Sequence, residues 1–267
     1  MSHMSSDDPL VIAIDSSTTS TKAIVVDTQG NVISLGRREI ALLSPEQGFG
    51  EHDPRQWWTS THEAVGEAVG KLTPAEKERI KAFGITHQRE SFAPFTADGT
   101  PLRNGILWLD IRAADQAQRY GTPEIHALSG RPADVTPGLY KMAWLKEHEP
   151  ESLRAADKVT TVSAYIAFCL TGSWVDSAAC ADSLSLSNIR TLDYDEGLLQ
   201  IAGVRRDQMA GLVKPGQTLG ALKPELAKEW GVAEIPVIAG CGDGQAAGVG
   251  AAAVTPDVAY LNMGTAV

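Results

Sequence analysis

Cysteine, aromatic residues and positive charge are all scarce in this sequence of 267 residues. The three cysteines are odd in number and form no CxxC pair, so we expect neither a disulfide framework nor a zinc site, and a reducing cytoplasm fits. No apolar stretch reaches the length of a membrane span. Lysine and arginine number 23 against 33 acidic residues, and a net charge of -10 argues against a nucleic-acid partner, which demands a basic face. Aromatic content of only 6%, with abundant glycine, favours an α/β enzyme over a β-sandwich.

What is present predicts alternating strands and helices. Short β-branched runs at 10–14, 23–27 and 32–35, with a Gln-Gly-Asn turn before the last, predict an opening meander of three antiparallel strands. A helix then begins near Asp53 as N-cap, with Pro54 in the first turn and Gln56 able to close a capping box.

The remaining elements are predicted from the same patterns. Strands are expected at 80–85, 92–96, 106–109, 237–239 and 258–262, helices at 140–147, 163–170 and 242–253, and a Ser-, Ala- and Asp-rich loop at 173–190. The order predicts a mixed sheet with helices on its faces.

Residues 15–22 form the first segment that could carry chemistry. Six hydroxyl residues lie between Asp15 and Lys22, in the turn between the first two strands. Small hydroxyl side chains let backbone N–H groups surround an anion, and a carboxylate at a strand end can hold Mg²⁺ through water. The alternative, at even odds from composition, is an ordinary Ser/Thr-rich hairpin loop.

Residues 87–90 form the second segment, four polar residues at the end of a buried strand. Ligands of α/β sheets gather beyond the carboxyl ends of strands, and Arg89 with Glu90 could bind neighbouring hydroxyls, one donating and one accepting. Taken alone, a surface ion pair is the more common explanation of such residues.

Residues 240–247 form the third segment, glycine-rich and placed between a strand and a helix. Asp243 could accept the proton of a substrate hydroxyl that attacks a phosphoryl group, or it could only cap the helix. The spacing Gly242-x-Gly244-x-x-Ala247 also fits a dinucleotide fingerprint, although no acid ends the next predicted strand. A fourth segment, at Gly264 and Thr265, could cradle a second phosphate or be only a turn.

The four segments together resemble the FGGY family of carbohydrate kinases, from about residue 10 to the end of the chain. The resemblance implies an actin-like (ribonuclease H-like) ATPase domain, with a mixed five-stranded sheet flanked by helices. It implies ATP and Mg²⁺ as cofactors and phosphorylation of a sugar or polyol hydroxyl. By this resemblance, phosphates contact Ser17, Thr18, Thr19, Lys22, Gly264 and Thr265; the substrate contacts Arg89, Glu90 and Asp243; the metal contacts Asp15 and Asp243; and Asp243 is the catalytic base.

Departures from the family pattern leave the substrate open. Ser17 stands where the family often has glycine, and Gly244 stands where the glycerol-phosphorylating members have glutamine. Residues 141–150 look more like the members that phosphorylate xylulose. The acceptor is therefore either a ketose such as xylulose or a small polyol such as glycerol.

The resemblance also sets expectations for domain organisation. Residues 1–8 are expected to be a tag and a disordered start, because Met-Ser-His-Met resembles an expression-vector scar. Residues 9–267 are expected to be the N-terminal domain of such a kinase, whose partner is the absent C-terminal domain and which alone should be inactive. A homodimer is left open. The competing hypotheses are a non-catalytic sugar-binding domain and, ranked lower, a dinucleotide-binding oxidoreductase fragment.

Overall fold

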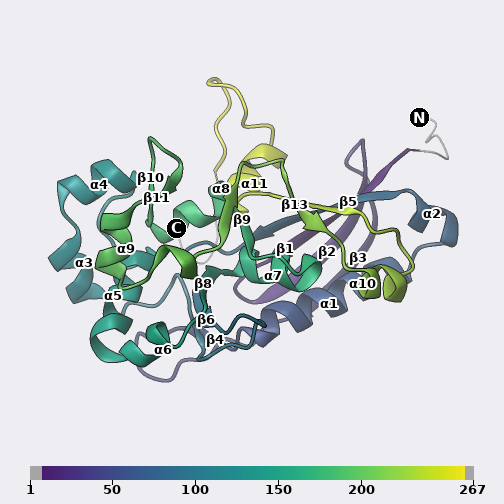
Figure 1. The fold of residues 1–267 in the computed structure, drawn as a ribbon. Coiled ribbons are helices and arrows are strands. Elements are labelled where there is room, and N and C mark those ends of the chain that lie inside the picture. The colour runs from purple at the N-terminus through teal and green to yellow at the C-terminus, as the bar shows by residue number, and fades with distance from the viewer. Residues whose placement is uncertain (1–7, 262–267) are drawn as a thin grey trace.

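A computed structural model describes residues 8–261, and its centre is a six-stranded mixed sheet in the order β13-β14-β5-β1-β2-β3 (Figure 1). The strands are β1 (Leu10–Ser16), β2 (Ser20–Asp27), β3 (Val32–Glu39), β5 (Ile80–His87), β13 (Thr218–Ala221) and β14 (Pro236–Ile238). The predicted meander is confirmed, since β1, β2 and β3 pair antiparallel, whereas β1 and β14 both pair parallel with β5. The expected count of five strands was wrong because β13 adds an antiparallel edge beside β14.

Helix α1 (Arg55–Gly70) packs against β2 and β3 through a buried face that includes Trp57 and Ala64. The approach is close, because a Cβ on Gly36 of β3 would lie 2.0 Å from the main-chain oxygen of Ala64. The helix begins one residue later than predicted, with Pro54 as N-cap. The Asp53 carboxylate still accepts from the Arg55 N–H at 3.0 Å, but Gln56 closes no capping box and instead accepts from the Ala41 N–H.

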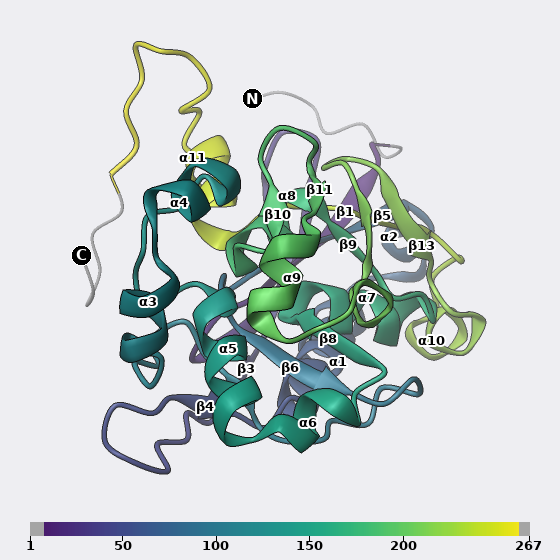
Figure 2. The same ribbon diagram turned by 60° about the vertical axis from the view of Figure 1, so that its left-hand side comes forward.

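A second group of elements lies beside the main sheet (Figures 1 and 2). It has its own apolar cluster, which includes Leu139, Met142 and Leu198. Its four-stranded sheet has the order β4-β7-β6-β8. These strands are β4 (Glu51–His52), β6 (Phe92–Phe95), β7 (Gly105–Ile106) and β8 (Lys158–Thr161). The helices around it are α3 (Ala114–Tyr120), α4 (Pro123–Ser129), α5 (Gly138–His148), α6 (Pro150–Arg154) and α9 (Glu196–Ala202).

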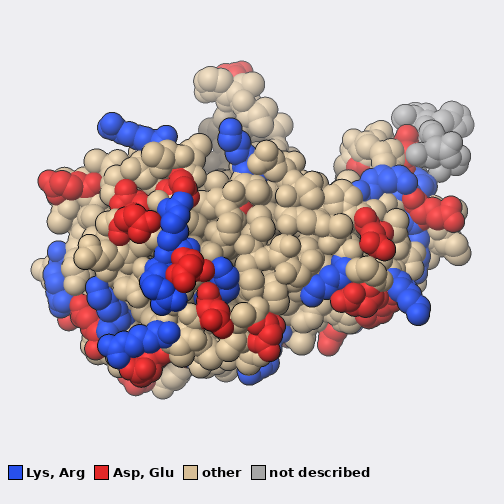
Figure 3. Space-filling view, viewed as in Figure 1, with Lys and Arg blue, Asp and Glu red and all other residues tan. Residues whose placement is uncertain are grey.

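The other described elements are short. They are α2 (Pro74–Glu78), α7 (Val162–Thr171), β9 (Val175–Ser177), α8 (Ala178–Ala181), β10 (Ser187–Asn188), β11 (Asp193–Tyr194), β12 (Gly211–Val213), α10 (Pro224–Trp230) and α11 (Asp243–Gly250), with 3-10 turns at Asp182–Leu184 and Arg206–Gln208. Within residues 8–261, no helix is both long enough and apolar enough to cross a membrane. Acidic and basic side chains are interspersed on the face drawn in Figure 3.

Two predictions of local structure were wrong. The stretch 173–190 is not a loop, because its polar residues are used internally: Asp176 accepts from the Thr161 hydroxyl at 2.6 Å, and Ser177 caps α8. Residues 258–261 do not form the predicted strand, because they pair with no neighbouring strand and leave Val258 and Leu261 exposed. The segment after α11 stands away from the body of the molecule in both views (Figures 1 and 2).

Candidate active site

Three of the four predicted segments meet at one edge of the main sheet. Because β1, β5 and β14 are parallel neighbours, the residues that follow each strand emerge side by side. Asp15 lies opposite Thr86 in the register, and His87 forms an isolated parallel bridge with Gly242. The fourth segment, Gly264 and Thr265, lies outside the described residues.

The turn between β1 and β2 carries the first segment. It closes with a hydrogen bond from the Ser17 N–H to the Ser20 oxygen at 3.0 Å, and it leaves Thr19 exposed. Thr18 is fixed from outside the turn, since its hydroxyl accepts from Trp108 Nε1 at 2.9 Å. Ser17 and Thr18 are partly exposed and Thr19 is exposed, so the tip of this turn remains accessible to an anion.

Arg89 and Glu90, the second segment, each have their own ion partner. Arg89 Nη2 donates to both carboxylate oxygens of Asp182 at 2.9 Å, and Arg131 pairs with Glu90 at 2.6 Å. Ion pairs are therefore present at this strand end, as the alternative expected, but each of the two residues pairs with a residue from elsewhere in the chain. Burial raises the pKa of Glu90, and the positive charges of Arg131 and Arg89 oppose that rise.

The backbone of Glu90 is also unusual. Its φ of 60° lies in the left-handed region, which is uncommon for a residue other than glycine. The Glu90 N–H donates to the Ser183 hydroxyl at 3.1 Å, and that hydroxyl donates to the Cys180 oxygen at 2.8 Å. These bonds hold the backbone of Glu90, and therefore the start of its side chain, in this left-handed conformation, which costs free energy.

The third segment places Asp243 as the first residue of α11, with Gly242 as the N-cap. Its Oδ1 accepts from the N–H of Gly244 at 2.8 Å. The turn before it is held by two hydroxyl groups: Thr86 donates to the Cys241 oxygen at 2.8 Å, and Ser177 donates to the Gly240 oxygen at 2.7 Å. The carboxylate is thus carried on a turn that is bonded to β5 and to the start of α8.

Asp15 and Asp243 lie near enough to influence each other. Burial raises the pKa of Asp15, the Lys22 ammonium 3.8 Å from it lowers that pKa, and the negative charge of Asp243 raises it again. Burial also raises the pKa of Asp243, which the guanidinium of Arg89 opposes. The Asp15 Oδ1 atom is buried and has no hydrogen-bond partner in the described chain.

This pair of carboxylates fits a magnesium ion better than a cation that needs a full protein cage. Among residues 8–261, no group of three or more His, Cys, Asp or Glu side chains is placed to hold a metal. Mg²⁺ commonly keeps several of its waters and takes one or two carboxylates, which is what Asp15 and Asp243 offer.

Several residues at this edge were missed by the sequence reasoning. Asp182 was assigned to a loop, and Arg131 lies far along the chain in a segment without a recognisable motif, so neither carried a usable signal. Trp108 had no predicted role either. A run of hydrogen bonds joins it to the site: Gln88 accepts from Ser91 at 3.1 Å, and Ser91 accepts from the Trp108 N–H at 3.1 Å.

Lys141 supports the same region from the protein interior. It is fully buried, and its ammonium donates to the main-chain oxygens of Leu107, Trp108 and Thr136 at 2.6, 3.0 and 2.8 Å. Burial lowers the pKa of Lys141 to about 7. All three of its donors are used, so it joins two loops beside the site and has no donor left for a ligand.

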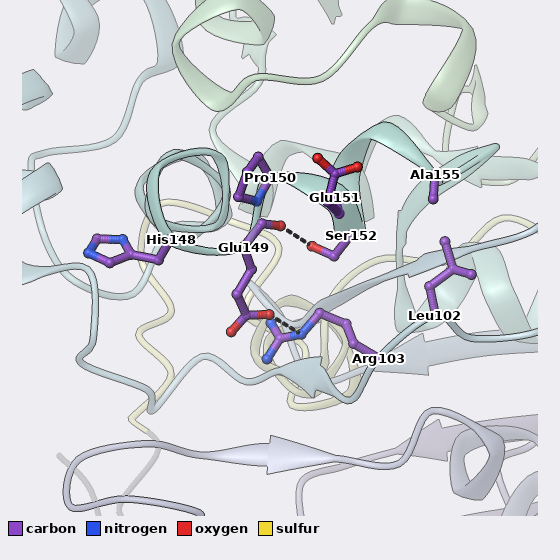
Figure 4. A pocket seen from close by; sticks show the side chains of 8 residues that line it. All are labelled: Leu102, Arg103, His148, Glu149, Pro150, Glu151, Ser152 and Ala155. Atoms are coloured by element: carbon purple, nitrogen blue, oxygen red, sulfur yellow. Dashed lines mark hydrogen bonds and ion pairs between the residues drawn. The ribbon is translucent and has the colours of Figure 1, made fainter.

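A large surface hollow lies elsewhere and contains none of the predicted residues. It has a volume of about 510 Å³ and is drawn in Figure 4. The guanidinium of Arg103 in it is already paired with Glu149 at 3.2 Å and with Glu51 at 2.8 Å. Because these charges pair with one another, the sheet edge remains the candidate site.

Comparison with known sequences gives a consistent result. A family model described as "FGGY family of carbohydrate kinases, N-terminal domain" matches residues 10–250. The xylulose kinase of Escherichia coli (strain K12) is 32% identical over 261 residues, which cover 96% of this chain and 53% of that protein. The glycerol kinase of Thermococcus gammatolerans is 32% identical over 263 residues, which cover 96% of this chain and 52% of that protein.

Solved structures agree. The xylulose kinase of Rhodospirillum rubrum superposes with a TM-score of 0.87 at 25% identity, covering 92% of this chain and 51% of that one. A ligand-bound xylulose kinase from Lactobacillus acidophilus gives a TM-score of 0.85 at 26% identity, covering 92% and 50%. The expected actin-like fold is confirmed. The chain spans about half the length of the curated relatives that it matches.

Proposed function

We propose a function on the premise that this chain belongs to the FGGY family of carbohydrate kinases. It supplies the acceptor-binding and general-base half of an enzyme that transfers a phosphoryl group from ATP to a hydroxyl of a ketose or a small polyol. The observation that supports this most is the meeting of Asp15, Arg89 and Asp243 at one sheet edge, although they come from three separate segments. Such an edge is where α/β sheets bind ligands.

In this proposal the acceptor hydroxyl lies against Asp243, whose carboxylate accepts the hydroxyl proton as the oxygen attacks. Arg89 donates a hydrogen bond to a neighbouring hydroxyl and Glu90 accepts one from another. Phosphoryl transfer depends mainly on positioning and charge neutralisation, so a carboxylate with a modestly raised pKa is a sufficient base.

Mg²⁺-bound ATP supplies the phosphoryl group and the charge that offsets its oxygens. Asp15 and Asp243 would hold the metal through water. The residues that would contact phosphates are Ser17, Thr18, Thr19 and Lys22, together with Gly264 and Thr265. Because the chain matches only half of its relatives, the second wall of the nucleotide cleft belongs, in this proposal, to a second domain. Closure of the two domains would exclude water, so this chain alone should turn over negligibly.

The competing hypotheses receive no specific support. A non-catalytic sugar-binding domain would use Arg89 and Glu90 but would not need a buried, unpartnered Asp15 oxygen. The dinucleotide hypothesis needs a strand after α11 that ends in an acid, and residues 251–261 contain no strand.

The test is Asp243→Asn in the two-domain kinase. We expect phosphorylation to fall by roughly 100- to 10,000-fold, the usual contribution of a general base, while sugar binding measured by calorimetry stays within a few-fold. Asp195→Asn is the matched control, because Asp195 caps α9 and asparagine caps equally well. If Asp243→Asn keeps its turnover as the control does, Asp243 is only a helix-terminal residue. Robust sugar phosphorylation by the 267-residue chain alone would contradict the half-enzyme proposal.

A further inference from the structure

The side chain of Arg89 follows a tightly defined path. Its aliphatic part lies over Gly242, where an added Cβ would come within 2.4 Å of Cδ and 2.5 Å of Cγ. Its Nη2 then reaches both oxygens of Asp182. The side chain of Arg89 is 19% exposed and that of Asp182 is 45% exposed, so the acid is the more accessible partner. The guanidinium is therefore already engaged by a carboxylate of the protein itself.

Acidic and basic groups around this pair balance in number, but each basic group is already engaged by protein atoms. Asp182, Glu90 and Asp243 face two guanidinium groups, those of Arg89 and Arg131. The Arg131 side chain is committed to Glu90 at 2.6 Å. The nearby ammonium of Lys141 is also committed, since its three donors are bonded to main-chain oxygens. An anionic ligand beside Arg89 would therefore find the nearby guanidinium and ammonium groups already bonded to protein oxygens.

The space next to Asp182 is lined by no basic side chain among the described residues. A cavity of about 260 Å³ opens beside it, and among the described residues that line it Asp182 alone is charged. The others are uncharged, with Ser129, Ser187 and Asn188 as the polar residues among a mainly apolar lining. Hydroxyl and amide groups can bond to a neutral hydroxyl compound, but no cation here could compensate a carboxylate.

We propose that Asp182 is a specificity-determining residue, which occupies the anion-binding fork of Arg89 and so restricts the acceptor to neutral polyhydroxy compounds. An acceptor bearing a carboxylate next to Arg89 is rejected, because Asp182 already fills the position that this carboxylate would need. A neutral acceptor instead donates hydroxyl hydrogen bonds to Asp182 and accepts from the remaining donors of Arg89. The inference deepens the proposed function and rests on it.

The test compares xylitol with D-xylonate, which share their carbon number and differ by one carboxylate. Dissociation constants are measured by saturation-transfer NMR on the 267-residue chain and on Asp182→Asn, with Asp182→Ser as a second variant. Wild type should prefer xylitol by at least about tenfold, and both variants should shift the ratio of the two constants toward xylonate by about tenfold, as removal of one adjacent charge would. Glu63→Gln, on the outer face of α1, removes the same charge and should leave the ratio unchanged.

The outcomes separate this proposal from the proposed function. An unchanged ratio in folded Asp182→Asn and Asp182→Ser, or a wild type that prefers xylonate, overturns the role of Asp182. If wild type binds neither compound and the two-domain protein phosphorylates no ketose or polyol, the proposed function itself fails. A ratio shifted equally by Glu63→Gln would also overturn the proposal, because the effect would then be one of net charge only.

Discussion

Gly240 offers a sharp test of how Asp243 is positioned. An added methyl group there would lie 2.0 Å from the main-chain oxygen of Ile85 and 3.1 Å from its carbonyl carbon, and neither atom belongs to a side chain that could rotate away. Because such contacts are not found below 3.0 Å, the turn or β5 must shift by about 1 Å. The shift would strain the two bonds that hold the turn, from Thr86 and Ser177.

The magnitude follows from these contacts. Overpacking against backbone costs about 1–3 kcal/mol, and each of the two weakened hydrogen bonds adds about 1 kcal/mol, so Gly240→Ala should lower the free energy of unfolding by roughly 3–5 kcal/mol. The assay is urea unfolding followed by circular dichroism, where the midpoint should fall at an unchanged slope. In the two-domain kinase, a 1 Å displacement of the base should also slow transfer on the order of 100-fold.

Gly244→Ala is the matched control, because it lies four residues further on, beside Asp243. A methyl group there meets nothing within 4 Å, and alanine is favoured over glycine in a helix by roughly 0.5–1 kcal/mol. Its unfolding midpoint should equal or exceed that of wild type. Equal midpoints for Gly240→Ala and Gly244→Ala would refute the reasoning.

Two further changes test the surroundings of the site. Complete burial raises the pKa of Asp176 to about 7, so between the unfolded value near 4 and pH 7 the folded chain keeps a proton that the unfolded chain releases. Wild-type stability, from urea unfolding at pH 5 and pH 8, should therefore fall as pH rises, by roughly 3 kcal/mol relative to Asp176→Asn, and a constant difference would contradict this. Trp108→Phe removes the indole N–H that holds the Thr18 hydroxyl. Nucleotide binding to the two-domain kinase, measured by calorimetry, should therefore weaken by several-fold. An unchanged affinity would exclude a role for Trp108 in positioning Thr18.

The comparison of sequence with structure shows what local patterns can convey. The meander was predictable because the β-branched runs of β1, β2 and β3 and the residues of the turns between them are features of short sequence segments. The convergence of residues 15–22, 87–90 and 240–243 on one edge followed from their positions at strand ends. Their roles in catalysis and binding stay predictions.

The failures have a common physical cause, which is that tertiary partners decided the outcome. Asp176 and Ser177 looked like loop residues, but their polar groups are satisfied inside the core. Asp182 and Arg131 became site residues only through contacts with Arg89 and Glu90, at separations that no local pattern encodes. Residues 258–261 have the composition of a strand, but in the described chain no neighbouring strand pairs with them.

The parallel pairing of β5 with β14 has a consequence for the order of folding. The β1-β2-β3 meander closes only short hairpins, whereas the bond from Thr86 to Cys241 joins residues 155 positions apart. Closing a flexible loop of that length costs about 4 kcal/mol of chain entropy, several times the cost for a hairpin turn. During synthesis, the meander can pair as soon as it emerges, but the turn that carries Asp243 can join β5 only after some 155 further residues have followed Thr86. The pairing of β5 with β14, which brings Asp243 to the site, thus joins residues far apart in the sequence. This large separation favours its formation as a late step in folding.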